Sequence, residues 1–168
     1  AIAIAAVRAF DAWRSPPLSL WHTETPQELH ADEIDGADWN AWLAAEARAF
    51  DEVRARVTDK LPDVDQVPAN RFFAGSPMHG SHFATDWNRS YVALPAESPR
   101  GAVVLVHGLT DSPYSLRHIG EFYRAQGFAV VAIRMPGHGT VPASLTRVRW
   151  EDWAAATNIL EEVGRETG

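Results

Sequence analysis

The residues whose types and spacing could support chemistry lie in two short loops, at 107–113 (HGLTDSP) and at 134–140 (RMPGHGT). Each loop follows a short apolar run, and such runs are typical of strands that are buried on both faces. Gly108 lets the backbone turn sharply after the first run, so that its N–H groups can point outward. In open α/β sheets, binding sites form beyond the carboxyl ends of the strands. We therefore predict that the first loop holds an oxyanion with backbone N–H donors.

The elements that must position these loops are a strand, a helix and a second strand in direct succession. The apolar runs at 102–106 and 128–133 predict the two strands. Between them we expect a helix at about 112–126, which ends at Gly127 in the C′ position. A unit of this kind is right-handed with parallel strands, so the predicted fold class is α/β. The residues expected to line one face of the helix are Leu116, Ile119, Phe122 and Tyr123. The other elements expected in this half are a strand at 91–94 and a helix at about 150–163.

Residues 1–90 are predicted to form a helical extension in front of this domain. Apolar residues at three- and four-residue spacing predict an amphipathic helix from about 39 to 58, with Asp38 as its N-cap. The apolar stripe of that helix consists of Trp39, Trp42, Leu43, Phe50, Val53 and Val57. The sequence Thr-Pro-Gln-Glu at 25–28 has the form of a capping box, which predicts one short helical turn.

The first seven residues form an apolar run that has two open interpretations. One is a short strand or a packed terminal segment. The other is the remaining tail of a longer signal or membrane anchor, because seven residues alone are far fewer than the roughly 20 that cross a bilayer. Arg8 and Arg14 would then lie at the membrane surface, and the protein would be membrane-anchored or periplasmic rather than cytoplasmic.

Composition excludes several classes of function. The net charge of −7 leaves no basic stripe for nucleic acid, and no G-x-G-x-x-G follows either strand for a dinucleotide. The absence of cysteine removes disulfides, thiolate metal sites and a cysteine nucleophile. His79 and His82 are three residues apart but have no third ligand placed near them in the sequence. We therefore predict neither a metal nor a cofactor.

The first loop resembles the HGx oxyanion loop of the α/β-hydrolase superfamily. The second resembles the PGHG loop of that family's carboxylesterases and monoacylglycerol lipases, and the overall likeness is to bacterial enzymes of the serine-aminopeptidase and lysophospholipase type. The resemblance covers 91–163, so 91–168 corresponds to the first half of a hydrolase core. It implies a parallel sheet with flanking helices and a small-molecule carboxylic ester, such as a monoacylglycerol or a lysophospholipid, as substrate.

The resemblance also implies roles for single residues. The backbone N–H of Leu109 would be one of two oxyanion donors, and the second donor would follow the nucleophile. Residues that shape or stiffen the loop would be His107, Gly108 and Thr110, and residues at the substrate pocket would be Asp111, Ser112 and His138. The catalytic base of the family follows the nucleophile and the acid in chain order, so His107 and His138 are expected to be structural.

The nucleophile motif G-x-S-x-G is absent from these 168 residues. We expect the nucleophile, the acid and the base in a remaining C-terminal part of the fold, in the same or a second chain. The strand at 102–106 would otherwise be a bare apolar edge. Two alternatives stay open: a hydrolase of the same fold with an aspartate nucleophile, and a non-catalytic module that binds a small molecule or a partner.

Overall fold

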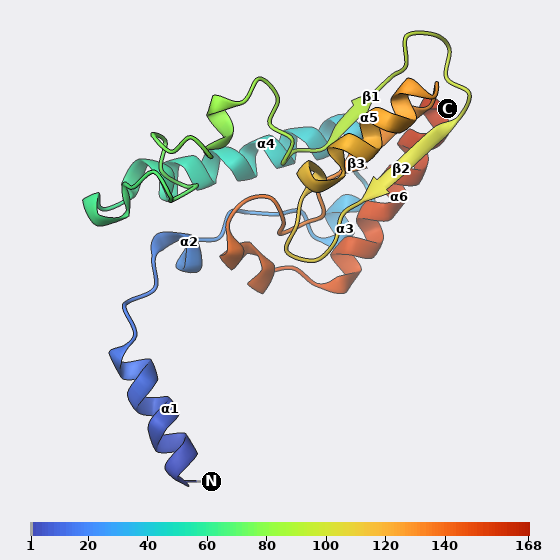
Figure 1. The fold of residues 1–168 in the computed structure, drawn as a ribbon. Helices are drawn as coiled ribbons and strands as arrows, with labels where there is room; N and C mark the ends of the chain where they lie inside the picture. Colours follow the sequence, from blue (N-terminus) through green and yellow to red (C-terminus); the bar gives the residue numbers. More distant parts are fainter. Residues whose placement is uncertain (1) are drawn as a thin grey trace.

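A computed structural model describes residues 2–168 as a three-stranded sheet with helices on both of its faces (Figure 1). The strands are β1 (Tyr91–Ala93), β2 (Ala102–Val106) and β3 (Ala129–Ile133), in the spatial order β1-β3-β2. β2 pairs with β3 in parallel, as the sequence predicts, whereas β1 pairs with β3 antiparallel. The helices are α1 (Ile2–Arg14), α2 (Leu20–Thr23), α3 (Ala31–Ile34), α4 (Trp39–Arg56), α5 (Arg117–Ala125) and α6 (Trp150–Thr167). The predicted α/β class is confirmed.

The core lies on the two faces of β3, all of whose residues are buried. Val131 and Ile133 pack in one cluster with residues of α3, α4 and α6. Val130 and Ala132 face the other way and pack with Leu105 and with Leu116 in front of α5. Successive side chains of a strand point to opposite faces, so β3 supplies the centre of both layers.

The predicted helix of the extension is confirmed as α4. Its N-cap is Asp38, whose carboxylate accepts a hydrogen bond from the Ala41 N–H at 2.7 Å. The helix ends at Arg56 and is followed by a 3₁₀ turn at Thr58–Lys60. The last helix of the chain is also found and is longer than predicted, because α6 continues to Thr167.

Of the apolar face predicted for the helix after β2, only Leu116 packs on the core. The segment splits into a 3₁₀ turn at Pro113–Leu116 and α5, and Ile119 and Phe122 are exposed. The buried residue of α5 is Gly120, where an added Cβ would lie 2.8 Å from the Tyr91 hydroxyl. The helix therefore approaches the sheet with its backbone, which large side chains on that side would prevent.

Two further expectations fail for identifiable reasons. Residues 25–28 are not helical, because the Glu28 side chain is drawn to Arg134 instead of forming a capping box. β2 is not buried on both faces: Val104 and Val106 are exposed. Within residues 2–168, β2 is an edge strand that pairs only with β3.

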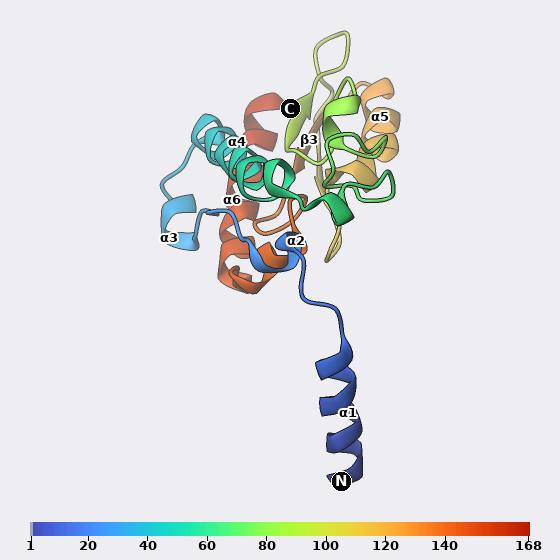
Figure 2. The same ribbon diagram turned by 90° about the vertical axis from the view of Figure 1, so that its left-hand side faces the viewer.

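The expectation of a short strand or a packed segment at 1–7 is also wrong. α1 is helical and stands away from the rest of the molecule (Figures 1 and 2). Its sequence is rich in alanine, which has the highest helix propensity, so a helix is favoured over a strand. All side chains from Ala3 to Arg14 are exposed.

The extension is joined to the sheet by the guanidinium of Arg134, the residue that directly follows β3. Arg134 is almost completely buried and pairs with Glu28 through two hydrogen bonds, Nη1 to Oε1 at 2.9 Å and Nη2 to Oε2 at 2.8 Å. The Oε1 atom of Glu46 lies 3.7 Å from Nε. Both carboxylates come from the extension, so this network fixes the extension to the end of β3.

Ser90 makes a second buried link between the same segments. Its N–H donates to Glu46 Oε1 at 2.9 Å. Its hydroxyl accepts hydrogen bonds from Trp42 Nε1 at 3.1 Å and from the Arg134 N–H at 2.8 Å. Burial raises the pKa of Glu46, while the charge of Arg134 acts in the opposite direction. The end of the extension is therefore held by neutral N–H donors in addition to the charged guanidinium of Arg134.

Replacing Glu28 by alanine is expected to lower the free energy of unfolding by about 3–5 kcal/mol, because it leaves a buried guanidinium without its partner. The matched control is Asp51→Ala, which removes an exposed ion pair with Arg54 at 3.1 Å and should cost less than about 1 kcal/mol. Urea denaturation of the two variants measures both values. Equal, small losses would contradict the central role of the Arg134 network.

Candidate active site

The two loops predicted to carry the chemistry meet at the carboxyl ends of β2 and β3. His107 follows β2, and its Nε2 accepts a hydrogen bond from the Met135 N–H in the loop after β3, at 3.0 Å. Its Nδ1 lies 2.9 Å from the Gly108 carbonyl, to which it donates. One ring nitrogen accepts and the other donates, which is the pattern of a neutral imidazole. Burial lowers the pKa of His107 and favours the same neutral form.

Beyond His107 the loop turns tightly and exposes its backbone. The Asp111 N–H donates to the Gly108 carbonyl at 3.2 Å, and Thr110 between them has φ of +63°. Threonine is β-branched and rarely adopts a positive φ, so the loop stores strain of about 1–3 kcal/mol. Leu109 is 69% exposed, and its N–H makes no hydrogen bond within residues 2–168. This N–H is available to a ligand.

The end of the extension supports both loops. The Ser112 hydroxyl donates to Asn88 Oδ1 at 2.9 Å. The Asn88 carbonyl lies against Gly139, where an added Cβ would be 2.9 Å from the carbonyl oxygen. Arg134 Nη1 also donates to the His138 carbonyl at 2.8 Å. Asn88, which lies outside the predicted hydrolase-like part, thus braces both the loop after β2 and the loop after β3.

A pocket of about 330 Å³ opens between the two loops. Four of the predicted site residues line it: Thr110, Asp111, Ser112 and His138. His107, Gly108 and Leu109 do not line it; they lie next to it in the same loop. Sequence reasoning missed the lining residues from the extension and from the end of the second loop, namely Trp21, Arg71, Phe72, Asn88, Val141, Pro142 and Leu145.

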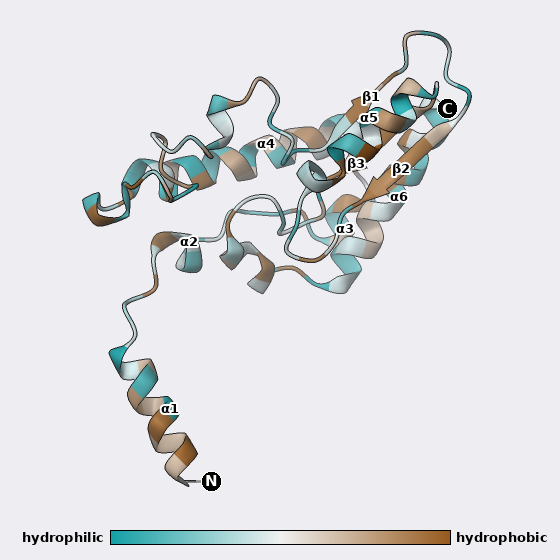
Figure 3. Cartoon of the chain, in the orientation of Figure 1, coloured by the Kyte–Doolittle hydropathy of each residue, from teal (hydrophilic) through white to brown (hydrophobic). Residues whose placement is uncertain are grey.

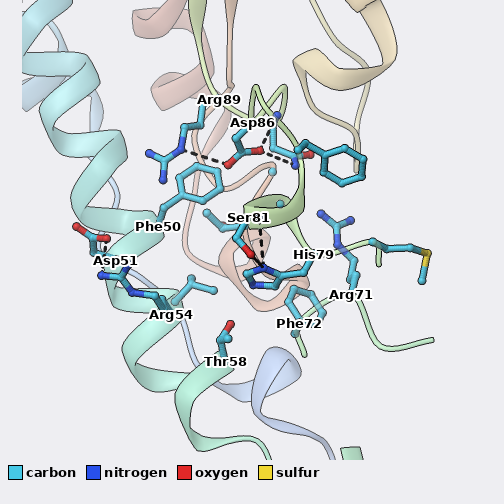
Figure 4. A pocket seen from close by; sticks show the side chains of 17 residues that line it. Phe50, Asp51, Arg54, Thr58, Arg71, Phe72, His79, Ser81, Asp86 and Arg89 are labelled. Atoms are coloured by element: carbon cyan, nitrogen blue, oxygen red, sulfur yellow. Dashed lines mark hydrogen bonds and ion pairs between the residues drawn. The ribbon is translucent and has the colours of Figure 1, made fainter. Parts of the chain in front are cut away.

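A second pocket of about 380 Å³ lies beside the first and shares Arg71 and Phe72 with it (Figure 4). Two of its arginines are already paired: Arg89 lies 3.2 Å from Asp86 and Arg54 3.1 Å from Asp51. The remaining lining between the helix α4 and the segment 71–89 is a mixture of aromatic and polar side chains (Figure 4).

Of the two histidines that are three residues apart, His79 lines the second pocket and His82 does not. His79 Nδ1 is 2.7 Å from the Ser81 hydroxyl, and His82 Nε2 is 2.8 Å from the Ala74 carbonyl. Burial and the neighbouring His82 lower the pKa of His79. No group of three side chains that could hold a metal ion occurs in the described part of the chain.

The positions of the buried charged residues in the sequence indicate that they are buried. Glu46 lies on the apolar stripe of α4, four residues after Trp42 and four before Phe50. A carboxylate in such a stripe must find a buried cation or neutralise, because burying an unpaired charge is costly. Arg134 follows directly on a buried strand and carries the same signal.

The chain was compared with known proteins. No protein-family model matches it. It is 39% identical over 61 residues to the thermostable monoacylglycerol lipase of Bacillus sp. (strain H-257), a match that covers 36% of this chain and 24% of that lipase. A solved structure of LipS and LipT, two metagenome-derived lipolytic enzymes, is matched over 45% of this chain and 31% of its own, with 32% identity and a TM-score of 0.39.

Over part of its length, this chain is homologous to the α/β-hydrolases. The resemblance expected from the two loops is thereby confirmed for part of the chain. The match spans about a quarter of the length of the curated lipase. The homology therefore concerns only a portion of a lipolytic hydrolase.

Two glycine variants should separate the role of each loop in folding. Gly139→Ala is expected to destabilise the protein by more than about 1 kcal/mol, because φ is +73° and the new Cβ would meet the Asn88 carbonyl. Gly108→Ala should leave the free energy of unfolding nearly unchanged, since nothing lies within 4 Å of its added Cβ. Thermal denaturation of both variants tests this contrast. A larger loss for Gly108→Ala would contradict it.

His107 is expected to titrate below pH 6.5 and to carry its proton on Nδ1 at pH 7. Because its folded pKa is depressed, the unfolded chain takes up a proton first as the pH falls. The contribution of His107 to stability is therefore present above about pH 6.5 and is lost as the pH falls toward the folded pKa. ¹H–¹⁵N correlation spectra of the imidazole measure both the tautomer and the midpoint. A midpoint above 6.5, or a proton on Nε2, would refute this assignment.

Proposed function

We propose that this chain forms part of the active site of a serine acyl hydrolase that acts on small carboxylic esters. The backbone N–H of Leu109 is one donor to the oxyanion, and the pocket between the two loops accepts part of the substrate. The nucleophile, the acid and the base belong to polypeptide outside these 168 residues, which contain no G-x-S-x-G.

In the proposed reaction, a serine hydroxyl attacks the ester carbonyl carbon while the base takes its proton. The carbonyl oxygen becomes an oxyanion that accepts hydrogen bonds from the Leu109 N–H and from a second donor after the nucleophile. The intermediate collapses and releases the alcohol, which receives the proton from the base. Water then cleaves the acyl-enzyme by the same sequence and releases the carboxylic acid.

The observation that carries the proposal is that the N–H of the exposed residue Leu109 has no hydrogen-bond partner within residues 2–168, beside the strained Thr110 at the end of a parallel strand. Strained backbone of this kind clusters at functional sites, where surrounding structure holds it in place. Homology to a lipolytic enzyme supports an ester as the substrate.

Two observations support a contribution from further polypeptide. The outer edge of β2 is unpaired within residues 2–168, and its exposed valines offer an apolar strand for pairing. The Nε2 atom of His138 is buried and has no hydrogen-bond partner among the described residues. Buried polar atoms almost always have partners, so we assign one to the part of the hydrolase that completes the site.

The apolar wall of the pocket suits an acyl chain. Trp21, Phe72 and Leu145 supply hydrophobic surface to its lining, together with the polar residues of the two loops. A monoacylglycerol or a lysophospholipid has the same division between an acyl chain and a polar head. We therefore propose that the acyl chain lies along the residues of the extension.

Replacing Leu109 by proline removes the N–H donor, whereas Leu109→Ala keeps it. In the full-length protein, Leu109→Pro is expected to lower kcat on a soluble ester by about 10²–10³-fold, and Leu109→Ala by much less. Leu109 is exposed, so neither new side chain meets a packed core, and circular dichroism checks that each variant folds. Equal kcat values for the two variants would contradict the oxyanion role of this N–H.

A fluorophosphonate probe distinguishes the reaction class in the same samples. Intact-mass spectrometry of the full-length protein should show one adduct on a serine outside this chain. An active esterase without the adduct would instead indicate an aspartate nucleophile in the same fold. A protein with neither an adduct nor ester hydrolysis is a non-catalytic module, and the proposed function is then wrong.

A further inference from the structure

Arg71 lies where the two pockets beside the loops meet, and it lines both of them. It belongs to the segment between α4 and β1, which contains both hydrophilic and hydrophobic residues (Figure 3). Its guanidinium carbon lies 5.6 Å from the centre of the Phe72 ring, and that ring stacks on Trp21 at 5.5 Å. Phe72 lines both pockets as well, and Trp21 lines the one between the two loops. A cation is thus placed next to the apolar wall that we assign to the acyl chain.

The charge of Arg71 is not compensated by a neighbouring carboxylate. Within residues 2–168 it forms no ion pair. The second pocket is also lined by Arg54, which pairs with Asp51. Its third arginine, Arg89, pairs with Asp86. The second pocket therefore has one uncompensated positive charge, although the net charge of the whole chain is −7. A guanidinium in this situation suits a phosphate or carboxylate ligand.

His79 supplies a second hydrogen-bond donor in the second pocket. Its Nδ1 accepts a hydrogen bond from the Ser81 N–H at 3.3 Å, so the neutral imidazole carries its proton on Nε2. Burial lowers the pKa of His79, which favours this neutral form. The Nε2–H makes no hydrogen bond within residues 2–168. Figure 4 shows Arg71 and His79 across the pocket from α4. The second pocket therefore combines a free cation with a free neutral donor.

A bound ester without charge would leave Arg71 in an unfavourable state. Its acyl chain would cover the aromatic wall next to the guanidinium and displace water from it. Removing water from a charge is costly unless an opposite charge takes its place. Asp111 lines the pocket between the two loops, but it does not pair with Arg71 and instead accepts a hydrogen bond from the Ser112 N–H at 2.8 Å. The compensating anion must therefore come with the substrate.

We propose that the second pocket binds an anionic group, a phosphate or a carboxylate, on the alcohol part of the ester, with Arg71 as its main ligand. This inference rests on the proposed function, which places the acyl chain in the pocket between the two loops. One ester can reach both pockets because they share five lining residues: Arg71, Phe72, Asn88, Gly139 and Thr140. A guanidinium can donate two parallel hydrogen bonds to either anionic group. The protein therefore prefers esters with an anionic head to neutral ones.

The experiment compares three soluble butyrate esters that differ in the charge of the alcohol: glycerol, glycerol 3-phosphate and glyceric acid. The full-length protein should have a higher kcat/KM for the two charged esters than for the glycerol ester. Arg71→Gln should lower the ratio of charged to neutral kcat/KM by about tenfold or more, because it removes a hydrogen bond between charged groups. The change should be mainly in KM, since the anionic head lies away from the reacting carbonyl. The charged ester with the larger decrease identifies the anionic group.

Arg48→Gln is the matched control. Arg48 is also exposed and forms no ion pair within residues 2–168, but it lines neither pocket. Its replacement removes the same charge from the surface and should change the ratio by less than about twofold.

The outcomes separate this inference from the proposed function. An unchanged ratio in Arg71→Gln, or equal decreases in both variants, would overturn the anion pocket. If the glycerol ester is hydrolysed and the charged esters are not preferred, the anion pocket is wrong and the proposed function stands. If none of the three esters is hydrolysed, the proposed function is wrong, and the inference that rests on it fails as well.

Discussion

The buried guanidinium of Arg134 is the interaction on which the rest of the structure depends. It stands at the end of β3 and is held by Glu28, which comes from a non-helical segment, and by Glu46, which comes from α4. A charge in this position is tolerated only with partners of opposite sign and good geometry. The extension must therefore fold against the sheet whenever β3 is formed. The same guanidinium donates to the His138 carbonyl, so the constraint reaches the loop beside the pocket.

This coupling makes the extension part of the candidate site. Asn88 accepts a hydrogen bond from Ser112 in one loop and lies against Gly139 in the other. His107, directly after β2, also joins the two loops, because its Nε2 accepts a hydrogen bond from the Met135 N–H. The loops are thus held from two directions, and the strain at Thr110 can persist because its neighbours determine its conformation. A site for a developing negative charge benefits from such rigidity, since its donors need not reorganise.

Several local predictions succeeded because short-range chemistry dominates there. Asp38 caps α4, and Gly127 follows α5 with φ of +86°, as their residue types indicate. The spacing of Ile119 and Phe122 predicts an apolar face but does not say which residue of α5 meets the sheet. Gly120 does so, because the helix backbone approaches closely. Propensity and periodicity describe one segment at a time, and the distance between two segments is a property of both.

The sequence by itself determined the α/β class, the parallel pairing of the two apolar strands and the likeness of the loops after them to α/β-hydrolases. These features follow from patterns within short segments. Only the tertiary structure decided that Glu28 pairs with Arg134 instead of forming a capping box, that Asn88 braces both loops and that α1 is exposed. The physical reason is that a buried charge selects its partner by proximity in space, and Glu28 and Arg134 are 106 residues apart in the chain.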